Sequence, residues 1–289
     1  MKGVVLAGGL GTRLRPLTSV TNKHLLPVYN QPMIYYPIQT LVNAGITDIM
    51  VVTGGSSAGD FLRLLGNGKA FGLKHLNYAY QEGEGGIADA LSLVEHFAAD
   101  APVCVVLGDN IIEGNILHAV NAYRAQGSGA KIILKKVPDP QRFGVPRLDG
   151  RRVVRIDEKP EKPQSDYAVI GIYMYDAQVY DIIKTLKPSG RGELEITDVN
   201  RTYLQYGQLH VTTLARGTAW LDTGTHGALL QAANYVQAIE ERQGLMIACI
   251  EEIAYRLNYI TAGDLERIGR RMQSSSYGEY LLRLVEQDA

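Results

Sequence analysis

Cysteine, tryptophan and long apolar runs are all scarce in this 289-residue sequence. Its two cysteines, Cys104 and Cys249, lie far apart, which excludes a disulfide framework or a zinc cluster and suits a reducing compartment. No segment approaches the ~18 consecutive apolar residues that a membrane-spanning helix needs. The apolar run at residues 4–7 is too short for the core of a signal peptide. We therefore expect a cytoplasmic protein with no membrane partner.

Net charge is nearly absent as well. The 29 Lys and Arg residues balance 30 Asp and Glu residues, so no nucleic-acid partner is predicted. The 46% of hydrophobic residues can form a sizeable core, and they exclude intrinsic disorder. One local asymmetry remains, because no Asp or Glu occurs before Asp48, whereas Lys2, Arg13, Arg15 and Lys23 are all cationic. By itself, such a run indicates only a solvated face.

In the first half of the chain, short segments rich in β-branched residues alternate with longer amphipathic ones. Strands are predicted over residues 4–7, 48–53, 75–81, 102–107 and 131–137, and helices over residues 32–43, 59–65, 87–97 and 116–126. This alternation indicates a parallel sheet that is covered by helices on both faces. The predicted fold class is α/β: a Rossmann-like three-layer α/β/α arrangement with a mixed, mostly parallel central sheet.

The second half of the chain follows a different pattern. Residues 152–157, 167–175 and 208–214 read as strands, several of them alternating, and they predict antiparallel strands inserted over the sheet. From Thr225 onward the pattern predicts a helical C-terminal segment, in which Thr261 is a candidate helix cap. The length fits two domains or one large α/β domain at about 150 residues per domain. Because no long linker is present, we predict a single domain over residues 1–289.

The strongest local feature is the glycine-rich segment at residues 6–18, LAGGLGTRLRPLT. It follows the first predicted strand, at the edge where parallel sheets bind ligands. Glycines let backbone N–H groups approach an anion, and the two arginines add charge suited to phosphate oxygens. A tight strand-to-helix turn with surface arginines would fit the bare Gly-Gly-x-Gly pattern equally well. The third glycine of a dinucleotide fingerprint and a GxxxxGK[ST] loop are both missing, which disfavours hydride transfer and P-loop ATPase activity.

The residues around these glycines are more specific than the glycines themselves. The pattern GGxGTRLxPLT, followed by NKHLLPV at residues 22–28, resembles the signature of sugar-1-phosphate nucleotidyltransferases. Within that family the detailed resemblance is to the glucose-1-phosphate thymidylyltransferase branch. It rests on LGDN at 107–110, EKP at 158–160, RGELEITDV at 191–199 and WLDTGT at 220–225. The resemblance runs from Lys2 to Arg256 and so covers nearly the whole chain.

This resemblance implies an activity and an organisation of the chain. The activity is transfer of a thymidylyl group from dTTP to α-D-glucose 1-phosphate, which yields dTDP-glucose and pyrophosphate by a single in-line displacement with Mg²⁺. The resemblance also implies the first step of dTDP-deoxysugar biosynthesis, a homotetramer, and feedback regulation by a dTDP-sugar. Residues 1–135 would form the nucleotide-binding half, residues 136–225 the sugar-binding half, and residues 226–289 a helical tail at an oligomer interface.

The implied reaction needs neither a general base nor a covalent Ser or Cys, because the attacking phosphate oxygen is already ionised. Catalysis then depends on positioning and on neutralising charge at the attacked phosphate and the leaving pyrophosphate. Arg13 and Lys23 are the catalytic candidates for this stabilisation, and Arg15 is a helper in nucleotide binding. The other loop residues expected to contact the nucleotide are Gly8, Gly9, Gly11 and Thr12.

Two aspartates are candidate ligands for Mg²⁺. Asp109 ends the apolar segment VCVVLG, and Asp222 follows Trp220-Leu221 much later in the chain. A carboxylate at the carboxyl end of a parallel strand points into the ligand crevice. Mg²⁺ typically takes one or two protein carboxylates in addition to phosphate oxygens and water. A turn aspartate that caps its own loop is the alternative for the Gly-Asp-Asn sequence.

For the sugar, the resemblance implies the contacts Asn110, Gly144, Glu158, Lys159, Val169 and Arg191. Glu158 offers acceptors for sugar hydroxyls, and Gly144 allows close approach of the backbone. Lys159 and Arg191 would lie near the sugar phosphate. Composition alone would favour a solvated strand end for Glu158-Lys159-Pro160.

For the base, the resemblance implies that Gln81 reads the thymine edge and that Gly86 lets the ring lie on the backbone. An amide can donate and accept at once, as the O4 and N3–H edge of a pyrimidine requires. His118, Arg216, Glu252 and Arg256 match a second nucleotide-sugar site of this branch, near a subunit interface, which implies a regulatory site.

Some residues depart from the pattern of the branch. Glu82 and Glu84 make the loop after Gln81 acidic, His24 stands where relatives often have Gln or Pro, and Ile170 replaces an expected Thr. These departures leave open the choice between dTTP and UTP and the details of the sugar pocket, but not the reaction class. The alternatives are the same reaction with UTP or with another hexose or hexosamine phosphate, and, as a different class, a catalytically inactive relative that only binds nucleotide sugars. The intact charged set of Arg13, Lys23, Asp109 and Asp222 favours an enzyme.

Overall fold

A central β-sheet forms the middle layer of the protein, for which a computed structural model describes residues 1–150 and 152–288. Within those residues the sheet has nine strands in the order β10-β9-β11-β6-β1-β4-β5, and β8 and β12 branch from β11. The parallel part comprises β1 (Lys2–Ala7), β4 (Asp48–Gly54), β5 (His75–Gln81) and β6 (Val103–Leu107). These segments were predicted as strands, and their predicted bounds agree to within two residues.

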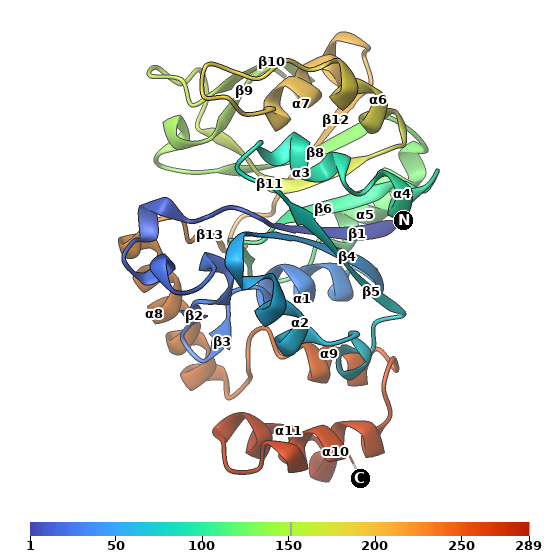
Figure 1. Cartoon of the computed structure of the whole chain (residues 1–289), viewed down its shortest axis with the longest axis vertical. Coiled ribbons are helices and arrows are strands. Elements are labelled where there is room, and N and C mark those ends of the chain that lie inside the picture. Colours follow the sequence, from blue (N-terminus) through green and yellow to red (C-terminus); the bar gives the residue numbers. More distant parts are fainter. Residues whose placement is uncertain (151, 289) are drawn as a thin grey trace.

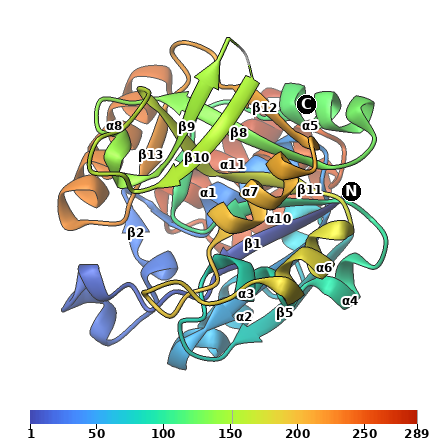
Figure 2. The same cartoon turned by 90° about the horizontal axis from the view of Figure 1, so that it is seen from above.

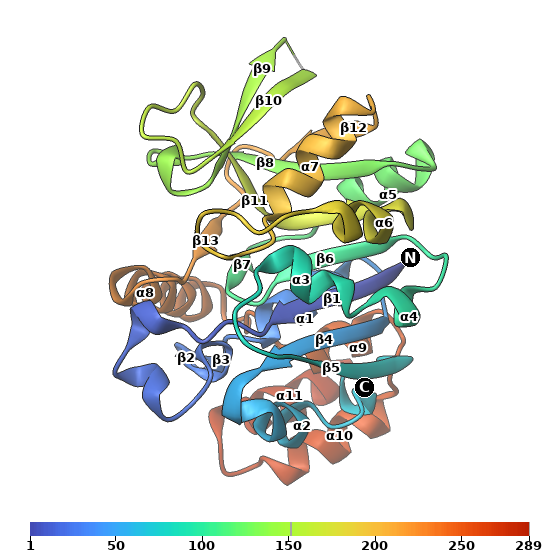
Figure 3. The same ribbon diagram turned by 45° about the horizontal axis from the view of Figure 1, so that its top comes forward.

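Helices cover both faces of the sheet because successive side chains of a strand point to opposite faces. On one face, Val5 belongs to a core that contains residues of α1 (Tyr35–Asn43), α2 (Ala58–Leu65), α5 (Leu117–Gln126) and α9 (Ile250–Arg256). On the other face, Val4 belongs to a core that contains residues of α3 (Ile87–Ser92), α4 (Glu95–Ala98), α6 (Gln178–Thr185) and α7 (Ile196–Gln205). Figure 3 shows the helices of the second group in front of the sheet. The predicted three-layer α/β/α class is confirmed.

The predicted antiparallel strands of the second half are present, but they extend the sheet and do not lie over it. β11 (Tyr167–Tyr175) pairs antiparallel with β6, with Ile172 opposite Val106, and also with β8 (Ala130–Lys136). Almost all of β11 is buried, since layers cover both of its faces. β9 (Gly144–Asp149) and β10 (Arg152–Glu158) form a hairpin beyond it, and β12 (Leu209–Thr213) runs parallel to β8. The hairpin projects from the sheet in Figure 3.

Several short elements had no counterpart among the predictions. β7 (Asn110–Ile112) pairs with β13 (Trp220–Asp222), and β2 (Pro27–Val28) pairs with β3 (Gln31–Pro32). Such strands are too short for a period to be recognised. The helix predicted over residues 87–97 is divided into α3 and α4.

The C-terminal segment is helical, as predicted. It contains α8 (His226–Gln243), α9, α10 (Ala262–Arg271) and α11 (Ser276–Gln287). The predicted cap is present. The Thr261 side chain accepts from the Asp264 backbone N–H, and the Asp264 side chain accepts from the Thr261 backbone N–H. Figures 1 and 2 show α8 and β13 at the same end of the molecule as the segment that follows β1. Among the described residues, no helix combines the length and the apolar character needed to span a membrane.

Candidate active site

The parallel strands bring four chain segments to one edge of the sheet. Gly8 follows β1, Gly54 and Gln81 are the last residues of β4 and β5, and Asp109 follows β6. The backbones are close at this edge, since a Cβ atom at Gly54 would lie 2.8 Å from the Gly8 carbonyl oxygen and 2.9 Å from that of Gln81. The carboxyl edge of a parallel sheet is where α/β proteins bind ligands.

The glycine-rich segment folds into a loop with short 3₁₀ turns. Gly11 has a φ of 63°, in the left-handed region, and the Thr18 hydroxyl donates to its carbonyl at 2.8 Å. A Cβ atom at Gly11 would lie 2.8 Å from the Cβ of Lys23, so Gly11 lets Lys23 pack against the loop. The buried Leu14 anchors the loop, whereas Thr12, Arg13 and Arg15 are exposed. The loop therefore directs backbone and cationic groups toward solvent at the ligand edge.

Lys23 and Asp109 form an ion pair at the centre of this edge. The Lys23 ammonium lies 2.6 Å from Asp109 Oδ2, and the two side chains are only 14% and 15% exposed. Burial raises the pKa of the Asp109 carboxyl, but the Lys23 charge and hydrogen bonds from Lys23 and Asn110 outweigh burial and hold this pKa well below its ordinary value. Asp109 is thus kept as a carboxylate next to a cation that can bind phosphate.

Asp222 reaches the same place through the pairing of β13 with β7. Asp222 lies opposite Asn110 in this pairing, and the Thr223 hydroxyl donates to the Asp109 carbonyl at 2.9 Å. Burial and then the charge of Asp109 raise the pKa of Asp222. A Cβ atom at Gly224 would lie 3.1 Å from Asp222 Oδ1 and 3.5 Å from a guanidinium nitrogen of Arg13. The structure therefore brings together Arg13, Lys23, Asp109 and Asp222.

The two carboxylates fit a hard divalent cation that takes its other ligands from outside the protein. Across residues 1–150 and 152–288, no cluster of three or more His, Cys, Asp or Glu side chains could hold a metal by itself. Two carboxylates combined with phosphate oxygens and water are the ligands that Mg²⁺ typically uses. Arg142, which the sequence reasoning missed, donates to Asp222 Oδ2 at 2.6 Å. Its neighbourhood on the chain, Pro-Gln-Arg-Phe, looks like an ordinary loop.

A second missed group holds Lys23 in place. The Asn22 side chain donates to the Ala7 carbonyl at 3.2 Å and accepts from the backbone N–H and ring Nδ1 of His24, at 3.0 and 2.7 Å. Burial first, and then the charge of Lys23, lower the pKa of His24 to about 3, so the ring is neutral. The residue between Asn22 and His24 is Lys23, whose backbone is thereby fixed to the end of β1.

Five of the residues predicted for the sugar gather where β9 pairs with β10 and β11. A Cβ atom at Gly144 would lie 3.5 Å from both Glu158 Oε2 and Thr197 Oγ1, and 3.6 Å from the Cβ of Val169. Thr197, which was not predicted, donates to Glu158 Oε2 at 2.6 Å. The remaining oxygen of Glu158 faces the two predicted cations, Lys159 at 3.6 Å and Arg191 at 4.0 Å.

Asn110, the sixth residue of this predicted set, is buried and already bonded. Its Oδ1 accepts from Trp220 Nε1 at 2.6 Å and from the Gly171 backbone N–H at 3.2 Å, while its Nδ2 donates to Asp109 at 3.1 Å. It therefore links Asp109 to β11 and β13.

Gln81, predicted to read the base, is 5% exposed at the end of β5. Its Nε2 donates to Asp89 Oδ2 at 2.7 Å and to the Gly86 carbonyl at 3.1 Å. Gly86 has a φ of 96°, and a Cβ atom there would lie 2.6 Å from the Leu194 carbonyl oxygen. The loop after β5 therefore packs on the segment that precedes α7.

The four residues predicted for regulation lie on three elements. Glu252 and Arg256 form an ion pair of 2.7 Å on α9, and Glu252 also accepts from the Tyr280 hydroxyl at 2.5 Å. His118 lies in α5, and Arg216 lies in the loop before β13, both exposed. Among the described residues, no hydrogen bond or ion pair links His118 or Arg216 to the pair on α9.

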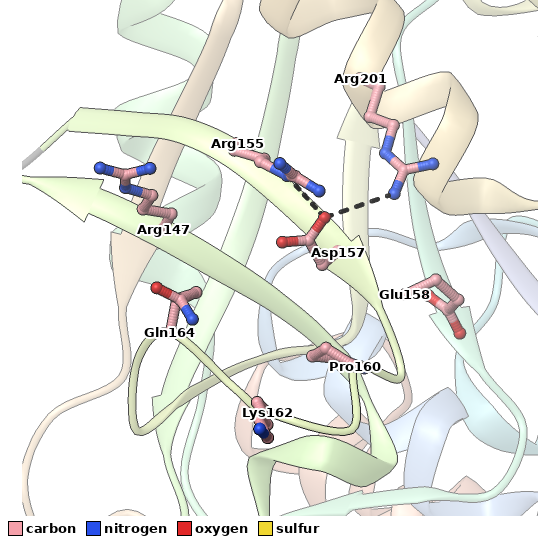
Figure 4. A pocket seen from close by; sticks show the side chains of 8 residues that line it. All are labelled: Arg147, Arg155, Asp157, Glu158, Pro160, Lys162, Gln164 and Arg201. Carbon is pink, nitrogen blue, oxygen red and sulfur yellow. Dashed lines mark hydrogen bonds and ion pairs between the residues drawn. The ribbon is translucent and has the colours of Figure 1, made fainter.

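A cavity of about 500 Å³ lies apart from this edge, between β9, β10, the loop after β10 and α7 (Figure 4). Arg155 donates to Asp157 inside it at 2.7 Å, and Arg201 lies 4.0 Å from the same carboxylate. Of the residues predicted for the sugar, only Glu158 borders the cavity.

A cationic glycine loop, a mostly buried Lys–Asp pair and a second carboxylate at one sheet edge define a site for nucleotidyl transfer. The model of the nucleotidyl transferase family matches residues 2–239, and the chain belongs to this family. Enzymes of this family generally use a divalent metal.

The chain is similar over its full length to glucose-1-phosphate thymidylyltransferases. The enzyme of Neisseria meningitidis is 48% identical over 99% of this chain and 100% of its own length. The enzyme of Mycobacterium tuberculosis is 46% identical over 100% of both chains.

Solved structures agree with these relatives. A structure described as a glucose-1-phosphate thymidylyltransferase of Bacillus anthracis has a TM-score of 0.77 at 48% identity and covers 81% of this chain and 94% of that one. A UDP-glucose pyrophosphorylase complexed with UDP-glucose has a TM-score of 0.72 at 22% identity and covers 82% and 98%. The second likeness is one of fold alone.

Proposed function

We propose that the protein transfers a thymidylyl group from dTTP to α-D-glucose 1-phosphate, giving dTDP-glucose and pyrophosphate. The observation that carries the proposal is the buried pair of Lys23 and Asp109, which lies beside Asp222 and the glycine loop. The full-length similarity to glucose-1-phosphate thymidylyltransferases supports the choice of substrates.

The chemistry is a single in-line displacement in which a phosphate oxygen of glucose 1-phosphate attacks the α-phosphorus of dTTP. Arg13 and Lys23 neutralise the charge that develops on the attacked phosphate and on the leaving pyrophosphate. The backbone around Gly8, Gly9 and Gly11, with Thr12 and Arg15, holds the triphosphate.

The sugar phosphate is held on the opposite side of the attacked phosphorus. Glu158, oriented by Thr197, accepts from sugar hydroxyls, and Gly144 and Val169 allow the ring to approach the backbone. Lys159 and Arg191 bind the phosphate of glucose 1-phosphate, which places its oxygen for attack. Such positioning supplies a large part of the rate in reactions that join two bound substrates.

Asp109 and Asp222 would hold Mg²⁺. When bound, the ion polarises phosphate oxygens and offsets their charge. The Lys23 ammonium keeps Asp109 ionised for this role, and Arg142 has to release Asp222.

The proposal is tested by measuring pyrophosphate release from glucose 1-phosphate with dTTP, UTP, ATP, CTP and GTP, each with and without Mg²⁺. We expect turnover with dTTP that EDTA abolishes and Mg²⁺ restores. Absence of turnover with every nucleotide would falsify the proposed activity.

UTP is the second candidate nucleotide. The observation that favours it is that the free polar atom of the Gln81 amide is its oxygen, whose partner N3–H is common to thymine and uracil. The relative turnover of dTTP and UTP in the same assay decides between them.

We further propose how the chain is organised and regulated. It forms one domain over residues 1–289, with a nucleotide-binding half (1–135), a sugar-binding half (136–225) and a helical tail (226–289) at the interface of a homotetramer. It acts in the cytoplasm, where reducing conditions suit the two free, buried cysteines, and catalyses the first step of dTDP-deoxysugar biosynthesis.

Regulation would use a second site formed by His118, Arg216, Glu252 and Arg256, which binds a dTDP-sugar. The Arg256 side chain is 52% exposed, so part of its guanidinium can bind a ligand while its Nε stays bonded to Glu252. We expect a dTDP-deoxysugar to inhibit the wild type more strongly than Arg256→Ala. Equal inhibition of the two proteins removes this assignment.

A further inference from the structure

The side-chain amide of Gln81 has a defined orientation, because the two groups beside it can only accept hydrogen bonds. One is the Asp89 carboxylate at 2.7 Å, and the other is the Gly86 carbonyl at 3.1 Å. A carboxylate and a backbone carbonyl have no hydrogen to donate, so the amide must turn its NH₂ group toward both. Both hydrogens of Nε2 are thereby used.

The amide oxygen consequently lies on the other side, against the glycine loop. A Cβ atom at Gly8 would lie 2.5 Å from Gln81 Oε1, so this oxygen borders the phosphate-binding backbone. The expectation that Gln81 donates and accepts at once therefore does not hold for this chain. Toward a ligand at the end of β5, the side chain of Gln81 offers an acceptor only.

The structure around Asp89 explains how its carboxylate comes so close. A Cβ atom at Gly85 would lie 2.4 Å from Asp89 Oδ2, so only glycine fits at that position. Leu194 holds the loop from outside, because its N–H donates to the Gly85 carbonyl at 2.8 Å and its carbonyl accepts from Ala88 at 3.2 Å. Asp89 is therefore placed by two segments of the fold and cannot move aside freely.

We propose that Asp89 is a positioning residue for nucleotide selection: it fixes the Gln81 amide so that Oε1 accepts from the N3–H of a pyrimidine. Thymine and uracil carry that hydrogen, whereas N3 of cytosine is an acceptor and would face Oε1 without a hydrogen between them. The inference deepens the proposed function and rests on it. It predicts that the enzyme discriminates against cytidine nucleotides through Asp89, a residue that does not touch the base.

The test compares wild type, Asp89→Ala and Asp89→Asn for kcat and KM with dTTP and with dCTP at saturating glucose 1-phosphate. In Asp89→Ala the amide can rotate, so we expect the selectivity for dTTP over dCTP in kcat/KM to fall about tenfold or more. The fall should come from KM, with kcat for dTTP nearly unchanged. Asp89→Asn can turn its own oxygen toward Gln81, so it should restore most of the selectivity.

Two further variants make the result unambiguous. Glu84→Gln removes a negative charge from the same loop at an exposed position and should match the wild type. If Asp89→Ala fails to fold, Asp89→Leu, which also lacks an acceptor and is similar in size, gives the same comparison.

The failures of the two proposals differ. Unchanged selectivity in a folded Asp89→Ala or Asp89→Leu enzyme that still uses dTTP overturns the role of Asp89 and leaves the proposed function intact. A loss of kcat equal for both nucleotides also overturns it, because that result indicates a merely structural role. A wild type that uses neither dTTP nor UTP overturns the proposed function itself.

Discussion

At the scale of single residues, the ligand edge depends on charges that are buried in pairs. Lys23 and Asp109 are both mostly removed from water, and each would be costly to bury alone. Burying this pair therefore costs free energy. Ligand binding can offset part of that cost, because Lys23 would then pair with phosphate and Asp109 with a cation.

Replacing Lys23 tests its assigned role. We expect Lys23→Ala to lower kcat by about 10²–10³, as does loss of one preorganised charge-stabilising donor, and to lower the thermal unfolding temperature because Asp109 loses its partner. Lys69→Ala, at an exposed lysine after α2, is the matched control. Full activity of Lys23→Ala would remove the role given to this lysine.

His24 predicts a specific pH dependence of stability. In the folded protein its pKa is about 3, against 6.5 for an unperturbed histidine, because burial disfavours the charged ring. As the pH falls below 6.5, the unfolded chain takes up a proton that the folded chain refuses. The stability contribution is therefore complete above pH 6.5 and is lost at about 1.4 kcal/mol per pH unit down to about pH 3.

Urea unfolding at pH 7, 6 and 5 measures this effect. The free energy of unfolding of His24→Gln should fall less steeply with decreasing pH than that of the wild type. The reason is that the variant lacks the one proton that only the unfolded wild type binds. His96→Gln, at an exposed position on α4, should keep the wild-type slope. Identical slopes in all three proteins would contradict a neutral, buried His24.

At the scale of elements, the loop after β1 depends on backbone conformations that only glycine adopts easily. Gly11 combines a positive φ with close contact to Lys23, whereas Gly207, after α7, has a φ of 71° and nothing within 4 Å of its Cβ position. Substitution of the two glycines therefore distinguishes the effect of the left-handed backbone conformation from the effect of the contact with Lys23.

We expect Gly11→Ala and Gly207→Ala each to lose about 1–2 kcal/mol of stability from the left-handed conformation. Only Gly11→Ala should displace Lys23, and its kcat should fall about 100-fold, as expected for a catalytic group misplaced by about 1 Å. Chemical denaturation and steady-state kinetics measure the two effects. Equal activity of the two variants would show that the contact with Lys23 does not matter.

Elements with a clear period were predictable, and those defined by pairing were not. The strands around Val4 and Val105 are apolar on both faces, and this pattern is typical of buried parallel strands. β7 and β13 exist because two short segments, more than 100 positions apart, pair through Asn110 and Asp222. No local pattern encodes that pairing.

At the scale of the whole molecule, the two halves meet through one extended sheet. In this sheet β11 lies next to β6, and the β9–β10 hairpin lies beyond β11. The loop after β5 is hydrogen-bonded to Leu194. The proposed nucleotide and sugar residues therefore lie on one connected framework. Within the tail, α10 and α11 form a separate core with α9, in which Leu265 and Leu281 pack with Ala254.

The tail also leads to a prediction about assembly. Leu230 of α8 is 62% exposed, and it belongs to the tail that we propose to lie at the interface of a homotetramer. We expect sedimentation velocity to give four times the mass of one chain, and Leu230→Glu to shift the protein toward smaller species. Leu62→Glu, at a 52% exposed leucine on α2 outside the tail, should leave the assembly intact. A monomer at every concentration would contradict a tetramer.

The fold class, the glycine loop and the main charged residues were predictable from the amino-acid sequence alone. These depend on local patterns: apolar runs, glycines where the backbone must turn, and cations in a segment without acids. Which of these groups meet became clear from the three-dimensional arrangement alone. Asp109 and Asp222 come together because β7 pairs with β13. Arg142 donates to Asp222, Thr197 donates to Glu158, and Asp89 orients the Gln81 amide. Such contacts depend on the path of the backbone between distant segments and on the need to pair each buried polar group, which no local pattern records.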